Sequence, residues 1–172
     1  MKKTNDITQE KLADVFKAER AHLLRYACYR LGNEDDAKDV LQDTFLKLHT
    51  RIADTDDLQI NNLCSYIFRT LTNICAKWQT LSNRVKTIQL DKRMDVVETS
   101  DHENEVDYRR IVHLLTEIPD EQAEVIRLRI YGDNSFAEVA EILSLPLPTV
   151  KSRFLYGLEK LRKGMKKTIN ND

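Results

Sequence analysis

Apolar residues recur every three or four positions along most of the chain, a spacing that predicts amphipathic helices. The first stripe covers residues 9–31 and ends at Gly32, a residue suited to stopping a helix. Asn33 can cap a second helix to about residue 52 by accepting from backbone N–H groups of its first turn. A third apolar stripe covers residues 63–84. Three helices of this length predict a small bundle.

The pattern changes after this bundle. Residues 86–105 lack helical periodicity, and the run from Asp95 to Asp107 holds six acidic residues and no basic one, which predicts a linker. Helical spacing resumes at Val106, and Pro119 breaks it and can open the next helix. The sequence therefore predicts an N-terminal helical domain over residues 8–85 and a C-terminal one over residues 106–168.

The C-terminal domain carries the pattern of a helix-turn-helix. Ser135 and Glu138 have the spacing of a capping box, which starts a short helix at residue 136. Residues 144–146 form a short turn, and Pro148 fits the first turn of the helix that follows. The apolar positions of this second helix share one face, and they are Val150, Phe154, Leu158 and Leu161.

Composition supports an all-α fold, because 172 residues with only 4 Gly and 3 Pro provide little turn material for many strands. The net charge of −1 hides a strong segregation along the chain. Residues 148–167 carry seven Lys/Arg and one acid, and residues 66–93 carry six Lys/Arg and one acid. Two basic segments separated by acidic ones predict two nucleic-acid surfaces.

The outward face of the last helix combines hydroxyls, cations and one aromatic ring, as contact with phosphates and the major groove requires. We expect six of its residues to bind DNA: Thr149, Lys151, Ser152, Arg153, Tyr156 and Lys160.

Several other classes of protein are not supported. No secretory signal or membrane-spanning run is expected, and the three separated cysteines are typical of reduced thiols in a cytoplasmic protein. The four histidines lack metal spacing, and no catalytic motif is present, so we expect no cofactor, no metal and no enzyme activity. Asp35, Asp36 and Asp39 match a D-D-x-x-D magnesium-diphosphate motif, but a prenyl-transferring enzyme also needs a second acidic motif and a large apolar cavity.

Four segments together resemble the RNA polymerase sigma factors of the extracytoplasmic-function type. They are DVLQDTF at residues 39–45, YIFR at 66–69, EIPDEQAEVIRLRIY at 117–131 and TVKSR at 149–153. The resemblance covers roughly residues 10–168 and implies binding to core RNA polymerase and to promoter DNA at initiation. By the habit of the family it also implies an anti-sigma partner.

The resemblance implies a role for each surface. The last helix would read the −35 element, and the acidic linker would run toward the polymerase active site. Four residues of the third helix would contact the −10 element: Arg69, Asn73, Lys77 and Arg84. The second helix would dock on the clamp helices of the polymerase largest subunit through an exposed side that holds Asp36, Asp39, Val40, Gln42, Asp43, Leu46 and Lys47. The loop over residues 53–61 would hold a base extruded from the opened strand.

The chain departs from the family pattern at several positions, among them Lys77, which replaces a common Asp, and Gln79 with Thr80, which interrupt an often Arg-rich run. Ser144 stands in the turn where the family favours Gly, and Tyr156 stands where the family often has Arg. The rival interpretation is a transcriptional regulator with a helix-turn-helix output and an unrelated helical sensor domain. A sensor domain has no reason to carry an acidic docking helix followed by a basic one, so the N-terminal domain distinguishes the two.

Overall fold

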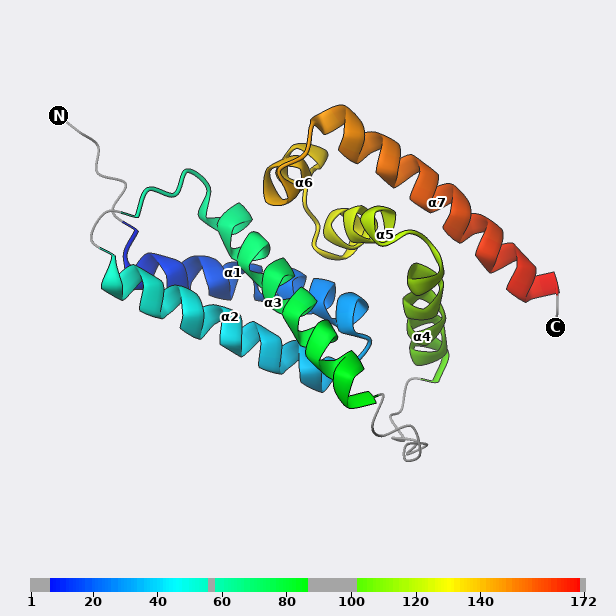
Figure 1. Cartoon of the computed structure of the whole chain (residues 1–172), viewed down its shortest axis with the longest axis horizontal. Helices are drawn as coiled ribbons and strands as arrows, with labels where there is room; N and C mark the ends of the chain where they lie inside the picture. The colour runs from blue at the N-terminus through cyan, green and yellow to red at the C-terminus, as the bar shows by residue number, and fades with distance from the viewer. Residues whose placement is uncertain (1–6, 56–57, 87–101, 171–172) are drawn as a thin grey trace.

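The computed structural model describes residues 7–55, 58–86 and 102–170, and every regular element in these ranges is helical (Figure 1). Most of the predicted acidic linker lies outside the described residues. The elements in chain order are α1 (Gln9–Leu31), α2 (Glu34–Asp54), α3 (Leu63–Lys86), α4 (His102–Glu117), α5 (Asp120–Ile126), η1 (Arg127–Tyr131), α6 (Phe136–Leu143) and α7 (Leu147–Asn170). The predicted all-α class is confirmed.

The ends of α1 and α2 follow from their local sequence. Gly32 ends α1 in the left-handed region at φ 72°, where it lacks the Cβ that would be strained, and its N–H donates to the carbonyl of Cys28. The Asn33 side chain accepts from the Asp36 N–H at the start of α2, so the predicted cap is confirmed. The helices α1, α2 and α3 pack on one another as a bundle.

The prediction that Val40 belongs to the exposed side of α2 is wrong. Its side chain is 0% exposed, because α2 packs against both α1 and α3 and therefore buries a wide face. Thr44, one turn later, is also buried and donates its hydroxyl to the Val40 carbonyl. The exposed side of α2 is consequently narrower and more acidic than the sequence pattern indicated.

The helix-turn-helix comprises α6, the turn after it, and α7. Both hydrogen bonds of the predicted capping box are present: the Glu138 N–H donates to Ser135 Oγ, and the Ser135 N–H donates to the Glu138 carboxylate. Val150 of α7 is fully buried against the core, as its inward position predicted. The capping box fixes the residue at which α6 begins, and the buried Val150 fixes the position of α7 on the core.

The segment after Pro119 is less regular than its sequence predicted. It begins as α5 and widens into the π-helical segment η1, in which the Gly132 N–H donates across five residues to the Arg127 carbonyl at 2.9 Å. Because η1 packs on α1, the irregular turn lies where the C-terminal helices meet the N-terminal bundle.

Ser144 adopts the left-handed conformation at φ 53°, which normally favours Gly. We expect Ser144→Gly to stabilise the protein by about 1 kcal/mol and to raise the melting temperature by about 2–4 °C, because glycine removes the Cβ strain. Thermal unfolding followed by circular dichroism measures this. Ser144→Ala is the matched control, since it removes the hydroxyl but keeps the strain, and it should not stabilise. Equal melting temperatures for the two variants would show that the left-handed backbone conformation at Ser144 costs no stability.

The two helical domains share one hydrophobic core. Its members include Leu12, Leu41 and Phe68 from the bundle together with Leu128 and Val139 from the C-terminal helices. The element contacts that join the domains are those of α1 with α4 and η1, and of α3 with α6. In the described residues no helix is long and apolar enough to span a membrane.

Candidate nucleic-acid and polymerase surfaces

The outer face of α7 is open to solvent at most of the predicted DNA-binding positions. Its exposed members are Lys151, Ser152, Tyr156 and Lys160. Thr149 is half-buried, and Arg153 is half-buried with its guanidinium 3.4 Å from the carboxylate of Glu121 on α5. This ion pair holds the Arg153 side chain of α7 against α5. The other two cations of the set, Lys151 and Lys160, form no salt bridge in the described part of the chain.

A second polar face runs along α3. Arg69, Asn73 and Lys77 follow one another at four-residue spacing, so they lie on one side of the helix, and all three are exposed. Arg84 belongs to the last turns of α3, but its side chain lies outside the described residues. Asn62 caps the start of this helix by accepting from the Ser65 N–H at 3.1 Å. The cap fixes the residue at which this helix begins.

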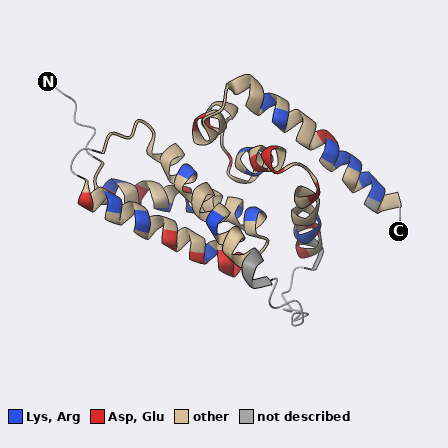
Figure 2. Ribbon diagram, in the orientation of Figure 1, with Lys and Arg blue, Asp and Glu red and all other residues tan. Residues whose placement is uncertain are grey.

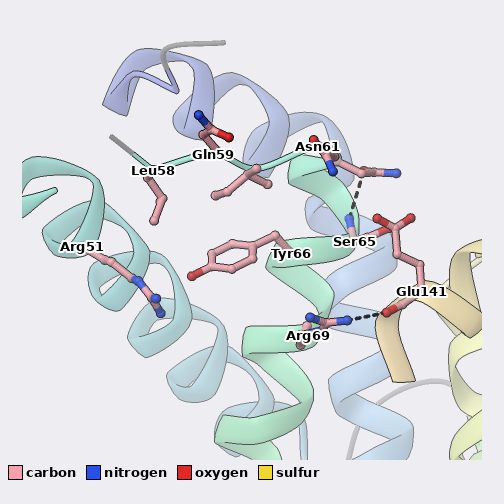
Figure 3. Close-up of a pocket in the computed structure, with 10 residues that line it drawn as sticks. Arg51, Leu58, Gln59, Asn61, Ser65, Tyr66, Arg69 and Glu141 are labelled. Carbon is pink, nitrogen blue, oxygen red and sulfur yellow. Dashed lines mark hydrogen bonds between the residues drawn. The ribbon is translucent and has the colours of Figure 1, made fainter. Parts of the chain in front are cut away.

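A pocket lies at the start of this face, between α2, α3 and the segment that connects them (Figure 3). Its volume is about 320 Å³, enough for one small planar ligand. Gln59 and Asn61 line it from the connecting segment, Tyr66 and Arg69 from α3, and Arg51 from α2. The pocket therefore lies where the sequence predicted a site for an extruded base.

The pocket is rich in groups that can recognise a base. The ring of Tyr66 lies under the guanidinium of Arg51, with 5.7 Å between the ring centroid and the guanidinium carbon. Its hydroxyl is buried and has no hydrogen-bond partner among the described residues. Sequence reasoning did not assign Arg51 or Tyr66 a part in this site. The only signal of the site in the sequence was the cation Arg51 near the end of α2 and the aromatic residue Tyr66 near the start of α3.

Glu141 was also missed, and it comes from the other domain. This α6 residue lines the pocket, and its carboxylate accepts from Ser65 Oγ at 3.3 Å (Figure 3). Arg69, which is predicted to contact DNA, lies against the end of α6 in this structure. It donates to the Glu141 carbonyl at 2.6 Å, to the Ile142 carbonyl at 3.2 Å and to Ser144 Oγ at 2.9 Å.

The exposed side of α2 is acidic. The residues predicted to contact polymerase that are exposed are Asp39, Gln42, Asp43, Leu46 and Lys47, and Asp36 is half-buried. Leu46 is 53% exposed and adds an apolar side chain to this polar side of α2. Figure 2 shows acidic residues interspersed with basic ones along α2, and mainly basic residues along α7. In the described ranges no group of three or more His, Cys, Asp or Glu side chains could hold a metal, so Asp35, Asp36 and Asp39 do not form such a site.

A buried ionic cluster joins the two domains, and we call it the Glu124 cluster: Tyr26, Arg30, Glu124 and Arg127. Glu124 is 8% exposed, and its carboxylate accepts from the Tyr26 hydroxyl and from the Arg30 and Arg127 guanidinium groups. Burial, followed by the charge of Glu124, raises the pKa of Tyr26 well above its ordinary value, so the hydroxyl stays protonated and donates. No pattern in the sequence predicted that α1 and α5 would contact each other.

The three cysteines are free thiols. Burial raises the pKa of Cys28 and of Cys64 to about 11, and that of Cys75 to about 12. All three therefore remain protonated near neutral pH, where the thiolate needed for oxidation or metal binding is scarce.

Known proteins match both domains. Residues 15–80 match Sigma-70 region 2 and residues 114–163 match Sigma-70, region 4. The ECF RNA polymerase sigma factor SigW of Bacillus subtilis is 28% identical, with 90% of this chain and 87% of that protein covered.

Two solved structures share the fold. CnrH, in complex with the cytosolic domain of CnrY, is 20% identical with a TM-score of 0.68 and covers 93% of this chain and 90% of its own. The sigma factor RpoE of Bartonella quintana, in complex with the anti-sigma factor NepR, is 22% identical with a TM-score of 0.65 and covers 92% and 96%. Since both regions match in order on one chain with an acidic α2 and a basic helix-turn-helix, the chain belongs to the extracytoplasmic-function group of the sigma-70 family.

Proposed function

We propose that the chain binds core RNA polymerase and directs it to promoters, where it reads the −35 element with α7 and captures the opened −10 strand with α3. The observation that carries this proposal is the presence of opposite charges on separate helices of one chain, acidic on α2 and basic on α7 (Figure 2). An acidic face repels DNA and suits a protein partner, whereas a basic face attracts the phosphate backbone. The chain itself performs no catalysis in this scheme.

The proposed polymerase surface is the exposed side of α2. Asp39 and Asp43 lie one helical turn apart, and Leu46 lies one turn further along the same helix. Charged residues around an exposed apolar side chain are typical of a protein interface with a small apolar centre. We infer that the clamp helices of the largest polymerase subunit contact this surface.

The proposed −10 surface is the polar face of α3 with the pocket at its start. Once a base leaves the duplex, its ring needs stacking and its edge needs hydrogen-bond partners, because unstacking costs a few kcal/mol. The Tyr66 ring, the unpartnered Tyr66 hydroxyl and the amides of Gln59 and Asn61 offer both kinds of contact. Arg69 and Lys77 would contact the backbone of the same strand.

The proposed −35 reader is the exposed face of α7. Lys151 and Lys160 are suited to phosphates, and Arg153 with Tyr156 can reach base edges when α7 lies in the major groove. Ser152 donates its hydroxyl to the Pro148 carbonyl at 2.9 Å, so its oxygen remains free as an acceptor. The first turns of α7 would therefore carry most of the sequence information.

We expect Tyr156→Arg to change the promoter preference toward a guanine at one position of the −35 element. An arginine can donate two hydrogen bonds to guanine, which is worth about 1–3 kcal/mol of discrimination, or roughly 5- to 150-fold. Selection from a randomised −35 library with core polymerase measures the change. Tyr156→Lys is the matched control for charge and should raise affinity without a comparable preference. An unchanged preference in Tyr156→Arg would contradict the placement of α7.

An anti-sigma partner is part of this proposal. CnrH and RpoE were both solved with bound partners, the cytosolic domain of CnrY and the anti-sigma factor NepR. An equivalent partner would have to cover the acidic side of α2 or the face of α3 to block initiation.

Core dependence of DNA binding tests the proposed function against the rival regulator. A random promoter library is incubated with the chain, with core polymerase, or with both, and bound DNA is sequenced. We expect one consensus with −35 and −10 elements to be enriched only when both proteins are present. Enrichment of a single operator by the chain without polymerase would instead support a regulator. The match of residues 15–80 to Sigma-70 region 2 argues against an unrelated sensor domain.

A further inference from the structure

We propose that the chain associates with itself head to tail, with α2 of one copy lying along α7 of a second copy in the antiparallel direction. Two exposed stripes of opposite charge and equal spacing, one on each helix, carry this inference. Its consequence rests on the proposed function, because each contact covers the polymerase surface of one copy and the −35 reader of the other.

A basic stripe continues the exposed face of α7 beyond the −35 reader. Lys160, Lys163 and Lys167 follow Tyr156 at intervals of four, three and four residues, so the four side chains lie on one face of the helix. All four are exposed. Lys163 also lies 3.3 Å from Glu159 of its own helix, an exposed ion pair of a kind that contributes little. The far half of α7 therefore offers a line of cations to an acidic partner.

An acidic stripe of the same spacing lies on α2. Its members are Asp36, Asp39, Asp43 and Leu46, at intervals of three, four and three residues. Asp36 is half-buried, and the other three side chains are exposed. Among the basic residues of α2, Lys38 lies to the side of the stripe, where it pairs with Glu34 at 3.2 Å. The stripe therefore presents three carboxylates followed by one apolar side chain.

The two stripes match along their whole length when the helices run in opposite directions. The facing pairs are then Asp36 with Lys167, Asp39 with Lys163, Asp43 with Lys160, and Leu46 with Tyr156. Opposite charges at facing positions set the partner and the direction of paired helices. In the parallel direction the charges would also match, but Leu46 would face Asn170. Because Leu46 is 53% exposed and Tyr156 is 60% exposed, their mutual burial favours the antiparallel direction.

The occupant of each stripe is a second copy rather than the same chain. Figure 1 shows α2 and α7 on opposite sides of the molecule, so the two faces do not meet within one copy. A contact between two different faces leaves one α2 and one α7 free at the ends of the assembly, where further copies can add. Exposed ion pairs are individually weak and are screened by salt, so the association is reversible and needs concentrated protein.

Sedimentation equilibrium of the free full-length chain measures the association. At about 200 µM protein and about 50 mM salt, we expect a weight-average mass at least about 1.5 times that of one chain, and at about 500 mM salt the mass of one chain. The mass should also rise with protein concentration at low salt. The mass of one chain under every condition would overturn the proposal.

Exchanging the charges tests the pairing of the two stripes. One variant carries Asp39→Lys with Asp43→Lys, and the other carries Lys160→Asp with Lys163→Asp. We expect each variant alone to sediment as one chain at low salt, because both of its stripes then carry the same sign. An equimolar mixture should regain the association, since the altered stripe of each variant is complementary to the unaltered stripe of the other. A mixture that stays monomeric would overturn the pairing.

The matched control for the α7 variant is Arg162→Asp with Lys166→Asp. Both residues are exposed, and each precedes a member of the basic stripe by one position, so both point about 100° away from it. This control makes the same change in net charge on the same helix. We expect it to sediment like the unmodified chain at low salt. If it loses the association as the variant of Lys160 and Lys163 does, net charge and not the stripe is responsible, and the proposal fails.

These measurements contain neither polymerase nor DNA, so their outcome is separate from that of the proposed function. A chain that supports transcription but never exceeds the mass of one copy would refute self-association and leave the proposed function intact. A chain that associates and passes the mixing test but supports no transcription would refute the proposed function and leave self-association intact.

Discussion

Reversing two charges on the exposed side of α2, with Asp39→Lys and Asp43→Lys together, should weaken binding to core RNA polymerase by about 100-fold. Both carboxylates are exposed and one turn apart, so the fold should tolerate the change while the proposed docking surface changes sign. Like charges brought together at an interface cost several kcal/mol, and complementary charges also set the association rate. Surface plasmon resonance with immobilised core polymerase measures affinity and rate.

The matched control is Glu10→Lys with Asp14→Lys on α1. These two acids are also exposed and four residues apart, so the control makes the same change in net charge at the same helical spacing. We expect it to bind core polymerase within about twofold of the unmodified chain, and the effect of the α2 variant to shrink as salt is raised. Equal affinities for the two variants would refute docking through α2.

The second large effect is expected at Gly157, where α7 crosses α5. A Cβ at this position would lie 2.7 Å from Ile126 Cδ1 and 3.2 Å from Gln122 Cβ, so the buried Ile126 side chain would have to shift and Gln122 would have to give way. We expect Gly157→Val to lower the free energy of unfolding by about 2–3 kcal/mol and to reduce −35 binding, because α7 can no longer pack as closely on α5. Urea unfolding and promoter binding with core polymerase measure the two effects.

Glu159→Val is the matched control for Gly157→Val. It places the same β-branched residue on an exposed position of α7, so it includes the loss of helix propensity but not the clash. We expect it to change the unfolding free energy by less than about 1 kcal/mol. If both variants unfold at the same urea concentration, the close approach of α5 and α7 is not a constraint on the fold.

Local signals in the sequence predicted the helices well. Gly32, Asn33 and the Ser135 capping box act through atoms within four residues, and the structure confirms each of them. The same holds for the inward position of Val150 on α7. Hydrophobic periodicity and end caps are properties of one helix, so they can be read without knowing what that helix packs against.

Contacts between helices were less predictable. Val40 was assigned to the exposed side because an apolar stripe does not reveal how many neighbours a helix has, and α2 has two. Arg69 was correctly placed on the polar face of α3, but its bonds to α6 join residues more than seventy positions apart. The Glu124 cluster joins residues of α1 and α5 that are more than ninety positions apart in the sequence, and no pattern in either helix marks its partner.

Transcription reconstituted from purified parts shows whether the chain directs core RNA polymerase to promoters. Core polymerase from the source organism is combined with the chain and with a promoter selected from the random library, and run-off transcripts are measured. We expect transcripts of one defined length that require both the chain and the selected promoter, and that fall sharply with Asp39→Lys and Asp43→Lys together. Transcript levels that are the same with and without the chain would contradict the proposed function.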